Sequence, residues 1–195
     1  MEIELLERQS SELRKDIVEV CYHSKAGHVG GSLSAIDILN VLYFNELRID
    51  PNNPKMENRD RFILSKGHIA EALYVTLAKR GFFAYSELDN FSGYNTKYIG
   101  HPNNKVAGVE INTGALGHGL AIGVGLAIAA KKMGQDYRTY VLMGDGELAE
   151  GSIWESAMAA GHYKLDNLCA IVDRNHLQIS GCTETVMPLE DLKGK

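Results

Sequence analysis

Residues 140–175 read YVLMGDGELAEGSIWESAMAAGHYKLDNLCAIVDRN. The apolar run at 137–143 predicts a buried strand, residues 152–163 predict a helix, and residues 168–173 predict a second buried strand. Strand, helix and strand in this order form a βαβ unit, whose right-handed crossover brings both strands to the same sheet. The carboxyl ends of the two strands are therefore expected at one edge.

The N-terminal third predicts two helices. Apolar residues recur at mostly three- and four-residue intervals over residues 3–24, which is the period of an amphipathic helix. After the segment AGHVGG, Ser32 or Ser34 can cap a second helix from about Ala35 to Phe44.

A further strand and two helices are predicted between these parts. The run at 61–65 predicts a strand, and residues 69–79 predict a helix that follows the loop 66–68. A long helix follows residues 112–119 and ends near Met133; its glycines at 117, 119, 123 and 125 indicate close contact with another backbone or a ligand. The alternation predicts an α/β fold: a mostly parallel sheet with helices on both faces.

Composition limits the function classes. The 195 residues are 45% apolar, enough for one globular domain over residues 1–195. A net charge of -5, without long basic runs, argues against nucleic acid, and the apolar segment 120–130 is too short to cross a bilayer. The acidic N-terminus lacks the pattern of a secretory signal, and three scattered cysteines match no disulfide framework. We expect a cytoplasmic protein.

Polar residues follow the two strands of the βαβ unit. Asp145, within Gly144-Asp145-Gly146, follows the first strand, and Asn175 follows the second about thirty residues later. Magnesium prefers oxygen ligands and commonly combines one or two carboxylates with substrate phosphates. The two side chains and a backbone carbonyl suit that ion, and the Gly146 N–H can donate to a diphosphate. The same GDG is also a common turn; the paired asparagine favours the metal site.

Six segments of this sequence occur in the order found in transketolases, and together the resemblance covers about residues 10–187. The spacing of GDG and asparagine is the signature that thiamine-diphosphate enzymes share, and the other segments resemble transketolase in particular. They are AGHVGGSLS (26–34), DRFILSKGHIAEALY (60–74), IGHPN (99–103), NTGALGHGLAIGVGLAIA (112–129), GDGELAEG (144–151) and DRNHLQISG (173–181). The chain thus resembles the domain that binds the cofactor diphosphate.

The resemblance implies roles for individual residues. Asp145, Asn175 and the Leu177 carbonyl would hold Mg²⁺, or Ca²⁺ or Mn²⁺ in its place. Gly146 and His68 would contact the diphosphate of thiamine diphosphate. The remaining assignments, also implied by the resemblance, are Gly114 and Leu116 at the thiamine, His28 and His101 facing the sugar, and Glu150 linking cofactor sites across a dimer.

These assignments have plainer alternatives. A histidine beside glycine is often only a loop residue satisfied by backbone groups. His118 and His176 lie inside the matching segments but replace other residue types of the family; His176 is given no catalytic role and His118 is a weak candidate.

The resemblance also implies an incomplete active site. In transketolases the glutamate that activates the cofactor lies in a pyrimidine-binding domain, and neither that domain nor the C-terminal one is found here. The segment GHVGGSLS is more similar to the separate N-terminal subunits of split transketolases. We therefore expect a C-terminal partner subunit in a homodimer or heterotetramer. The expected reaction is transfer of a two-carbon ketol unit between sugar phosphates, with pentose phosphates inferred from the family alone.

Two other interpretations stay open at this point. Deoxyxylulose phosphate synthase and the alpha subunits of 2-oxo acid dehydrogenases share the GDG-to-asparagine metal site, although IGHPN and TGALGHG favour transketolase. A non-catalytic protein that binds the cofactor or a partner is the alternative from a different class.

Overall fold

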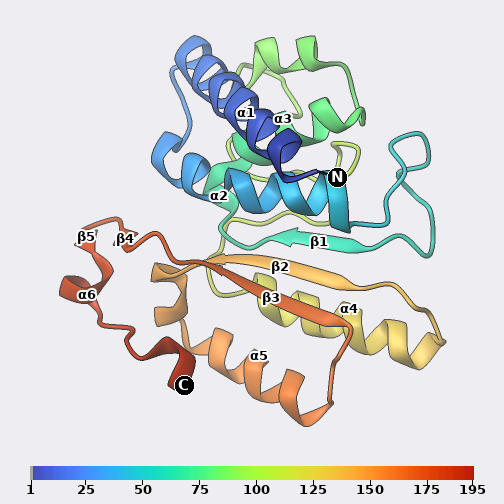
Figure 1. The fold of residues 1–195 in the computed structure, drawn as a ribbon, viewed down its shortest axis with the longest axis vertical. Coiled ribbons are helices and arrows are strands. Elements are labelled where there is room, and N and C mark those ends of the chain that lie inside the picture. The colour runs from blue at the N-terminus through green and yellow to red at the C-terminus, as the bar shows by residue number, and fades with distance from the viewer. Residues whose placement is uncertain (1) are drawn as a thin grey trace.

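The structure, a computed structural model, describes residues 2–195 as a three-layered α/β domain (Figure 1). Three parallel strands form the sheet in the order β1-β2-β3. Helices α1, α2 and α3 lie on one side of the sheet, and α4 and α5 lie on the other. The predicted fold class is confirmed. The strands are β1 (Arg61–Leu64), β2 (Thr139–Gly144) and β3 (Leu168–Asp173), and the helices are α1 (Ile3–Ser24), α2 (Val29–Val41), α3 (Ala70–Arg80), α4 (Gly119–Met133) and α5 (Gly151–His162).

The alternation of side chains along the strands divides the core into two layers. Successive side chains of a strand point to opposite faces of its sheet. Leu64 and Leu142 pack among the residues of α1, α2 and α3, whereas Ile63, Val141 and Met143 pack on the side of α4 and α5. Both faces of β1 and β2 are consequently buried, as expected for a parallel sheet between two helical layers.

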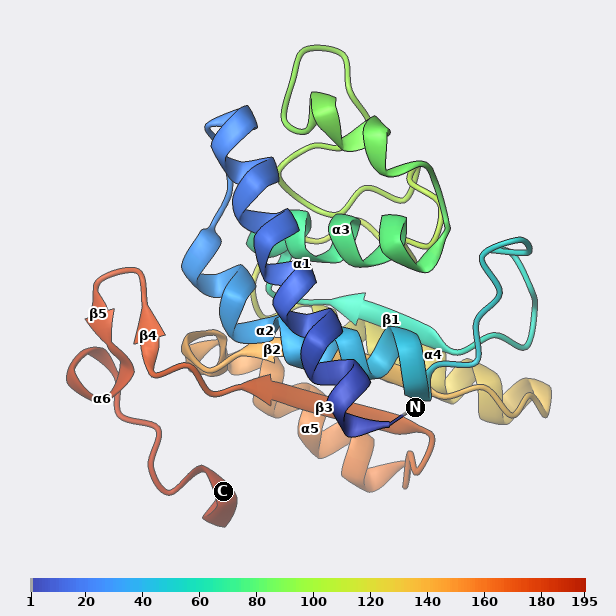
Figure 2. The ribbon, with the colours of Figure 1, turned by 45° about the horizontal axis from the view of Figure 1, so that its top comes forward.

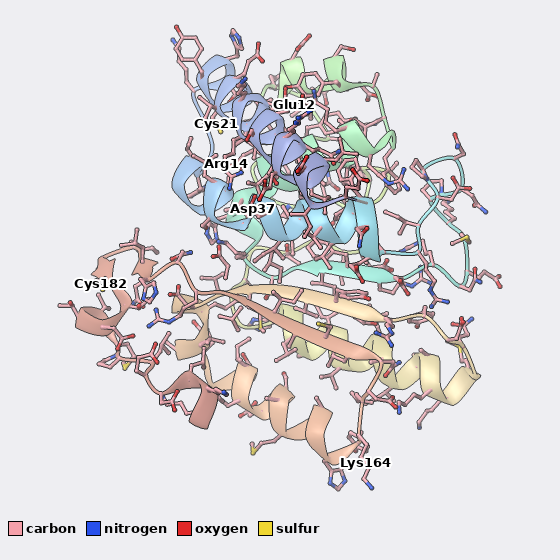
Figure 3. All side chains as sticks on the ribbon, viewed as in Figure 1. Glu12, Arg14, Cys21, Asp37, Lys164 and Cys182 are labelled. Carbon is pink, nitrogen blue, oxygen red and sulfur yellow. The ribbon has the colours of Figure 1, made fainter. Side chains whose placement is uncertain are left out.

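Helix α1 has the bounds that its periodicity predicts. Leu13, Ile17 and Val20 are buried against the other helices of this layer. On its other side, Arg14 forms an ion pair of 2.5 Å with Asp37 of α2, both labelled in Figure 3. The two helices are thereby held together by apolar packing and a surface pair.

Helix α2 begins at Val29, so the predicted start at Ala35 was wrong. Gly31, in its first turn, lies close to the chain after β1, whereas a Cβ on Gly30 would meet open space. A Cβ on Gly31 would lie only 3.0 Å from Cγ2 of Ile69. Space, rather than helix propensity, accounts for the glycine here, and the helix continues into a π-helical turn at Leu42–Glu46.

The serines predicted to cap α2 have other partners. The Ser32 hydroxyl donates to the Glu71 carboxylate at 2.7 Å. The Ser34 hydroxyl donates to the Asp173 carboxylate at 2.6 Å. Both acceptors come from distant parts of the chain, so the serines join elements instead of starting a helix.

Strand β3 is parallel to β2, but the prediction that it is buried was wrong. Cys169 and Ala170 are exposed, and only Asp173 at the end of the strand is buried. Within residues 2–195, β3 pairs with β2 alone and forms an edge of the sheet. An edge position explains why an apolar run is open to solvent.

Helix α4 contains glycines where it contacts the sheet. A Cβ on Gly119 would lie 2.9 Å from Cα of Ser65, and one on Gly123 would lie 2.5 Å from Cγ2 of Val141. The close contact with another backbone that was predicted is confirmed at Gly119, whereas Gly123 contacts side chains. At Gly125 no atom lies within 4 Å of such a Cβ, so within this chain the glycine has no such contact.

The chain beyond β3 lies past the carboxyl ends of the strands (Figures 1 and 2). A small antiparallel hairpin is followed by one short helix. These elements are β4 (Leu177–Gln178), β5 (Gly181–Cys182) and α6 (Thr183–Val186). Short 3-10 helices also occur at Gly67–Ile69, Tyr85–Asn90, Gly146–Ala149 and Leu192–Gly194. No helix within residues 2–195 combines the length and apolarity that a membrane span requires.

Candidate functional site

A cavity of about 300 Å³ lies at the carboxyl ends of the three strands. In open α/β sheets this edge is where ligands bind. The cavity brings together six residues that the sequence predicted for cofactor or metal binding: His68, Leu116, Asp145, Gly146, Asn175 and Leu177. Lys66, Gly144, Glu147, Gln178, Ile179 and Ser180 complete the lining.

Asp145 follows β2 directly and is fully buried. One carboxylate oxygen accepts from the Gly146 N–H at 2.9 Å. The other accepts from the His176 N–H at 2.8 Å and from the Arg174 guanidinium at 2.8 Å. Backbone donors and a cation therefore hold the carboxylate in a fixed orientation in the cavity wall.

Arg174 connects this carboxylate to the C-terminal segment. Its guanidinium also donates to Thr183 at 2.8 Å, to Glu184 at 2.5 Å and to Glu190 at 2.7 Å. Hydrogen bonds to the carboxylates of Glu190, Asp145 and Glu184 raise the pKa of Arg174 above its usual range. The sequence analysis gave Arg174 no role, although its place between Asp173 and Asn175 at the end of a strand was a usable signal.

Asn175 and Leu177, from the segment after β3, also line the cavity. The Asn175 side-chain oxygen accepts from the Leu177 N–H at 2.9 Å. His176 between them adopts a left-handed conformation with φ of 63°, which turns the chain from β3 into the hairpin. Leu177 is 65% exposed.

A buried ion pair joins the loop after β1 to the last residue of β3. The Lys66 ammonium lies 2.6 Å from Oδ2 of Asp173 and 3.1 Å from the Gly31 carbonyl. Lys66 is 1% exposed, and Ser34 donates to the same carboxylate oxygen. Both charges are thus paired and hydrogen-bonded, as a buried pair requires. The sequence analysis missed this pair because its members are 107 residues apart.

Glu147 ties the turn after β2 to the loop before α4. It is 2% exposed, and its carboxylate accepts from the Gly117 N–H at 2.9 Å and from the Gly144 N–H at 3.1 Å. The Ser65 hydroxyl donates to the same carboxylate. Glu147 therefore fixes three loops against one another, a role that its position in the GDGE segment did not reveal.

His68 lies on the loop after β1 with its ring in the cavity wall. Its ring and that of His28 form an edge-on pair with centroids 5.2 Å apart. Burial lowers the pKa of His68 to about 4, and the charge of Lys66 and the neighbouring His28 and His101 add to the effect. The imidazole of His68 is consequently neutral at pH 7.

His101 and Gly114 lie in contact outside the cavity lining. A Cβ on Gly114, which has φ of 149°, would lie 2.9 Å from Cδ2 of His101. The His101 carbonyl accepts from the buried Tyr74 hydroxyl at 2.8 Å. His28 and His101, from separate loops, each lie near enough to His68 to affect its pKa.

Glu150 precedes α5 and is exposed. It lies against Gly117, which has φ of 85°, and a Cβ there would lie 2.6 Å from Cβ of Glu150. Glu150 does not line the cavity within this chain. Within this chain, Glu150 therefore packs against the loop before α4.

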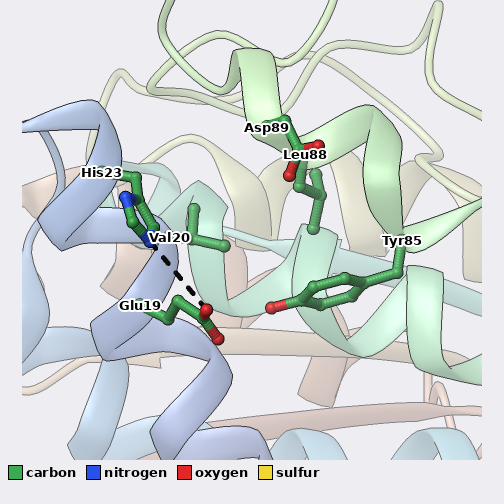
Figure 4. A pocket seen from close by; sticks show the side chains of 6 residues that line it. All are labelled: Glu19, Val20, His23, Tyr85, Leu88 and Asp89. Atoms are coloured by element: carbon green, nitrogen blue, oxygen red, sulfur yellow. Dashed lines mark ion pairs between the residues drawn. The ribbon is translucent and has the colours of Figure 1, made fainter.

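A second cavity of about 350 Å³ lies between α1 and the 3-10 helix Tyr85–Asn90 (Figure 4). Its rim carries Glu19 and His23, whose side chains lie 3.9 Å apart, and Asp89. None of the residues predicted for cofactor or metal binding lines it. The predicted chemistry therefore concentrates in the cavity at the sheet edge.

Comparison with known proteins identifies the family of this chain. A family model described as the thiamine diphosphate binding domain of transketolase matches residues 7–195. The chain belongs to the transketolase family. The family membership expected from the sequence motifs is confirmed.

Two relatives of this transketolase-family chain are named as subunits. It is 55% identical over 195 residues to one subunit of the apulose-4-phosphate transketolase of Phocaeicola vulgatus, a match that covers 100% of this chain and 69% of the relative. It is 42% identical over 191 residues to the SqwG subunit of the 6-deoxy-6-sulfo-D-fructose transketolase of a Clostridium species, covering 97% of this chain and 70% of the relative.

Solved transketolases share the fold. The structure of transketolase from Campylobacter jejuni superposes with a TM-score of 0.93 at 37% identity, over 100% of this chain. The same match covers 32% of the Campylobacter chain. This transketolase-family chain thus spans about a third of the solved enzyme that it resembles.

Proposed function

We propose that the chain binds thiamine diphosphate and a divalent metal ion in the cavity at the sheet edge. With a C-terminal partner subunit, it would transfer a two-carbon ketol unit from a ketose phosphate to an aldose phosphate. The observation that carries the proposal is the convergence of Asp145, Gly146, Asn175 and Leu177 on one cavity with His68.

The donor set suits magnesium. Asp145 supplies a carboxylate and Asn175 an amide oxygen, and Leu177 would add its backbone carbonyl. Within residues 2–195, no group of three or more His, Cys, Asp or Glu side chains is arranged to hold a metal ion. A site with one carboxylate needs further oxygens, and the diphosphate would provide them, so metal and cofactor are expected to bind together.

The diphosphate would meet donors from two loops. Gly146 would offer its backbone N–H, which in this structure donates to the Asp145 carboxylate, and a Cβ there would lie 2.7 Å from Cβ of Gln178, so a larger residue would clash with the hairpin. Neutral His68 can donate one ring N–H. When bound, thiamine diphosphate supplies the nucleophilic carbon that carries the ketol unit.

The sugar is expected on the histidine side of the cofactor. His28 and His101 flank His68, and we propose that they bind and orient the hydroxyl groups of the ketose. Gly114 and Leu116, on the loop before α4, would contact the thiamine. We further propose that Glu150 acts across a subunit interface, since it is exposed and does not line the cavity of its own chain.

The names of the relatives support a partner. Both are named as one subunit of a transketolase. We propose that the partner is a C-terminal transketolase subunit, in a homodimer or a heterotetramer. The free thiols of Cys21, Cys169 and Cys182 fit the proposed cytoplasmic location.

The relatives differ in the sugar that their names specify. One is named for apulose-4-phosphate and the other for 6-deoxy-6-sulfo-D-fructose. The first relative is 55% identical to this chain and the second 42%. Apulose-4-phosphate is therefore the donor to test first. A pentose phosphate would be the second.

Calorimetric titration with thiamine diphosphate and Mg²⁺ tests the cofactor site. We expect metal-dependent binding to the wild-type chain and a loss of more than about 100-fold in affinity for Asp145→Ala, because an outer-shell change already costs 10–100-fold. Asp166→Ala is the matched control: its side chain is 85% exposed and pairs only with Lys131, so affinity should not change.

The partner is tested in the same titration. Tighter binding and ketol transfer after addition of the C-terminal subunit would support the split active site. Full turnover by the isolated chain would contradict the need for a partner. Absence of binding in every mixture would instead favour a non-catalytic interaction protein.

A further inference from the structure

Glu71 is a buried carboxylate outside the cavity. It lies in the first turn of α3 and has no exposed surface. Its Oε1 accepts from the backbone N–H of His28 at 2.6 Å and from the Ser32 hydroxyl at 2.7 Å. One oxygen atom thus holds both the residue before α2 and the first turn of that helix.

The other oxygen of Glu71 indicates that stability alone does not explain this residue. Oε2 is buried and has no hydrogen-bond partner among the described residues. A buried acceptor without a partner destabilises the folded state. Neighbouring positions of α3, such as Ala72 and Leu73, are apolar and buried, so an apolar side chain would suit the packing of the helix.

The backbone before His28 is closely packed on the same carboxylate. Gly27 has φ of 123°, and a Cβ there would lie 3.1 Å from Oε1 of Glu71 and 2.6 Å from Sγ of Cys21. Burial and the Glu71 charge raise the pKa of Cys21 to about 11, so its thiol stays neutral. The close packing therefore restricts the conformations that the backbone before His28 can adopt.

We propose that Glu71 is a positioning residue for His28. By accepting from the His28 N–H, it fixes the backbone from which the His28 ring reaches His68, 5.2 Å away between centroids. The proposal rests on the proposed function, in which His28 orients the sugar. Glu71 itself touches neither the cavity nor the sugar.

Three substitutions separate this role from a general effect on folding. Glu71→Leu removes the acceptor, and Glu71→Asp withdraws it by one methylene while keeping the charge. Glu71→Gln retains an oxygen that can accept from both donors. Thr76→Val is the matched control, because Thr76 is buried on the same helix and its hydroxyl donates to the Ala72 carbonyl of that helix.

The first measurement uses the isolated chain and does not depend on activity. We expect the nuclear Overhauser contact between the His28 and His68 rings, and the chemical shift of the His28 ring, to change in Glu71→Leu and Glu71→Asp. Both signals should stay near the wild-type values in Glu71→Gln and Thr76→Val. Should the leucine variant not fold, the aspartate variant carries the comparison.

The second measurement uses the chain with its partner subunit. We expect the KM for the ketose donor to rise about tenfold or more in the leucine and aspartate variants, since small misplacements of positioning groups cost up to 10²-fold. Affinity for Mg-thiamine diphosphate should stay within about twofold. Glutamine should restore most of the KM.

The two measurements keep two failures apart. An unchanged ring contact and chemical shift in the leucine and aspartate variants would overturn the role of Glu71, whatever the activity. A ring contact that changes while the KM stays constant would leave Glu71 as the support of His28 and remove His28 from sugar binding, which contradicts the proposed function instead.

Discussion

His68 shows how the surroundings of one residue set its charge. Burial is the main cause of its low pKa, and Lys66, His28 and His101 add positive or potentially positive neighbours. An imidazole that stays neutral keeps one N–H donor and one acceptor. It can therefore bind a phosphate oxygen without requiring a proton from solvent.

The low pKa of His68 predicts how stability depends on pH. Between pH 6.5 and about 4 the unfolded chain binds a proton that the folded chain does not, so the free energy of unfolding falls as pH falls. After allowance for solvent screening of a partly exposed ring, we expect this contribution to be about 1–2 kcal/mol. Urea unfolding at pH 7 and pH 4.5 measures it.

His68→Gln provides the control for that measurement. Glutamine keeps a polar side chain of similar reach but does not titrate. The decrease in the free energy of unfolding between pH 7 and pH 4.5 should be smaller in this variant than in the wild type. An equal decrease would assign the pH dependence to other groups.

At the scale of the element, α4 offers two glycines with opposite surroundings. Gly123 faces Val141 of the sheet, with 2.5 Å to the nearest atom for an added Cβ, whereas Gly125 has open space. We expect Gly123→Ala to lower the free energy of unfolding by about 1–3 kcal/mol through overpacking. Chemical denaturation of the purified chain measures it.

Gly125→Ala is the matched substitution on the same helix. Alanine should raise the free energy of unfolding by up to about 1 kcal/mol, because it has the higher helix propensity and meets no neighbour. Equal effects at both positions would show that propensity, not contact with the sheet, governs these glycines.

The elements that the sequence predicted well are those whose cause is local. Helix α1 follows from the spacing of residues such as Leu13 and Ile17, and the convergence of Asp145 with Asn175 follows from the crossover of one βαβ unit. The start of α2 could not be predicted, because it depends on Glu71 and Asp173, to which its serines bind. Exposure of β3 likewise depends on which strands neighbour it.

The same reasoning explains the missed part of the candidate site. The partners Lys66 and Asp173 are 107 residues apart, and Ser65 and Glu147 are 82 apart. No period or short motif relates such positions. A general rule could have found them, because residues at the carboxyl ends of parallel strands lie at the same edge of the sheet. Lys66, Asp173 and Arg174 all have such positions.

At the scale of the whole molecule, Arg174 links the sheet edge to the C-terminal segment. Its contacts with Thr183, Glu184 and Glu190 hold that segment near Asp145. Arg174→Lys keeps the charge but loses the planar fork. We expect amide hydrogen exchange in residues 183–192 to become several-fold faster while exchange in β2 is unchanged.

Arg14→Lys is the control for that experiment. Arg14 makes a two-pronged contact with Asp37 on the opposite side of the sheet from α5. Its replacement should leave exchange in residues 183–192 as in the wild type. Slow exchange there in Arg174→Lys would mean that apolar packing, for example by buried Leu189, holds the segment.

The buried pairs at the sheet edge also bear on how a ligand would arrive. Lys66 is paired with Asp173 and Arg174 with Asp145, and the carboxylates of Glu147, Glu184 and Glu190 lie around them, so the site presents no excess of positive charge. Long-range electrostatic steering needs an excess of one charge sign. An anionic cofactor would consequently reach this domain by ordinary diffusion, and short-range contacts would decide whether each encounter ends in capture.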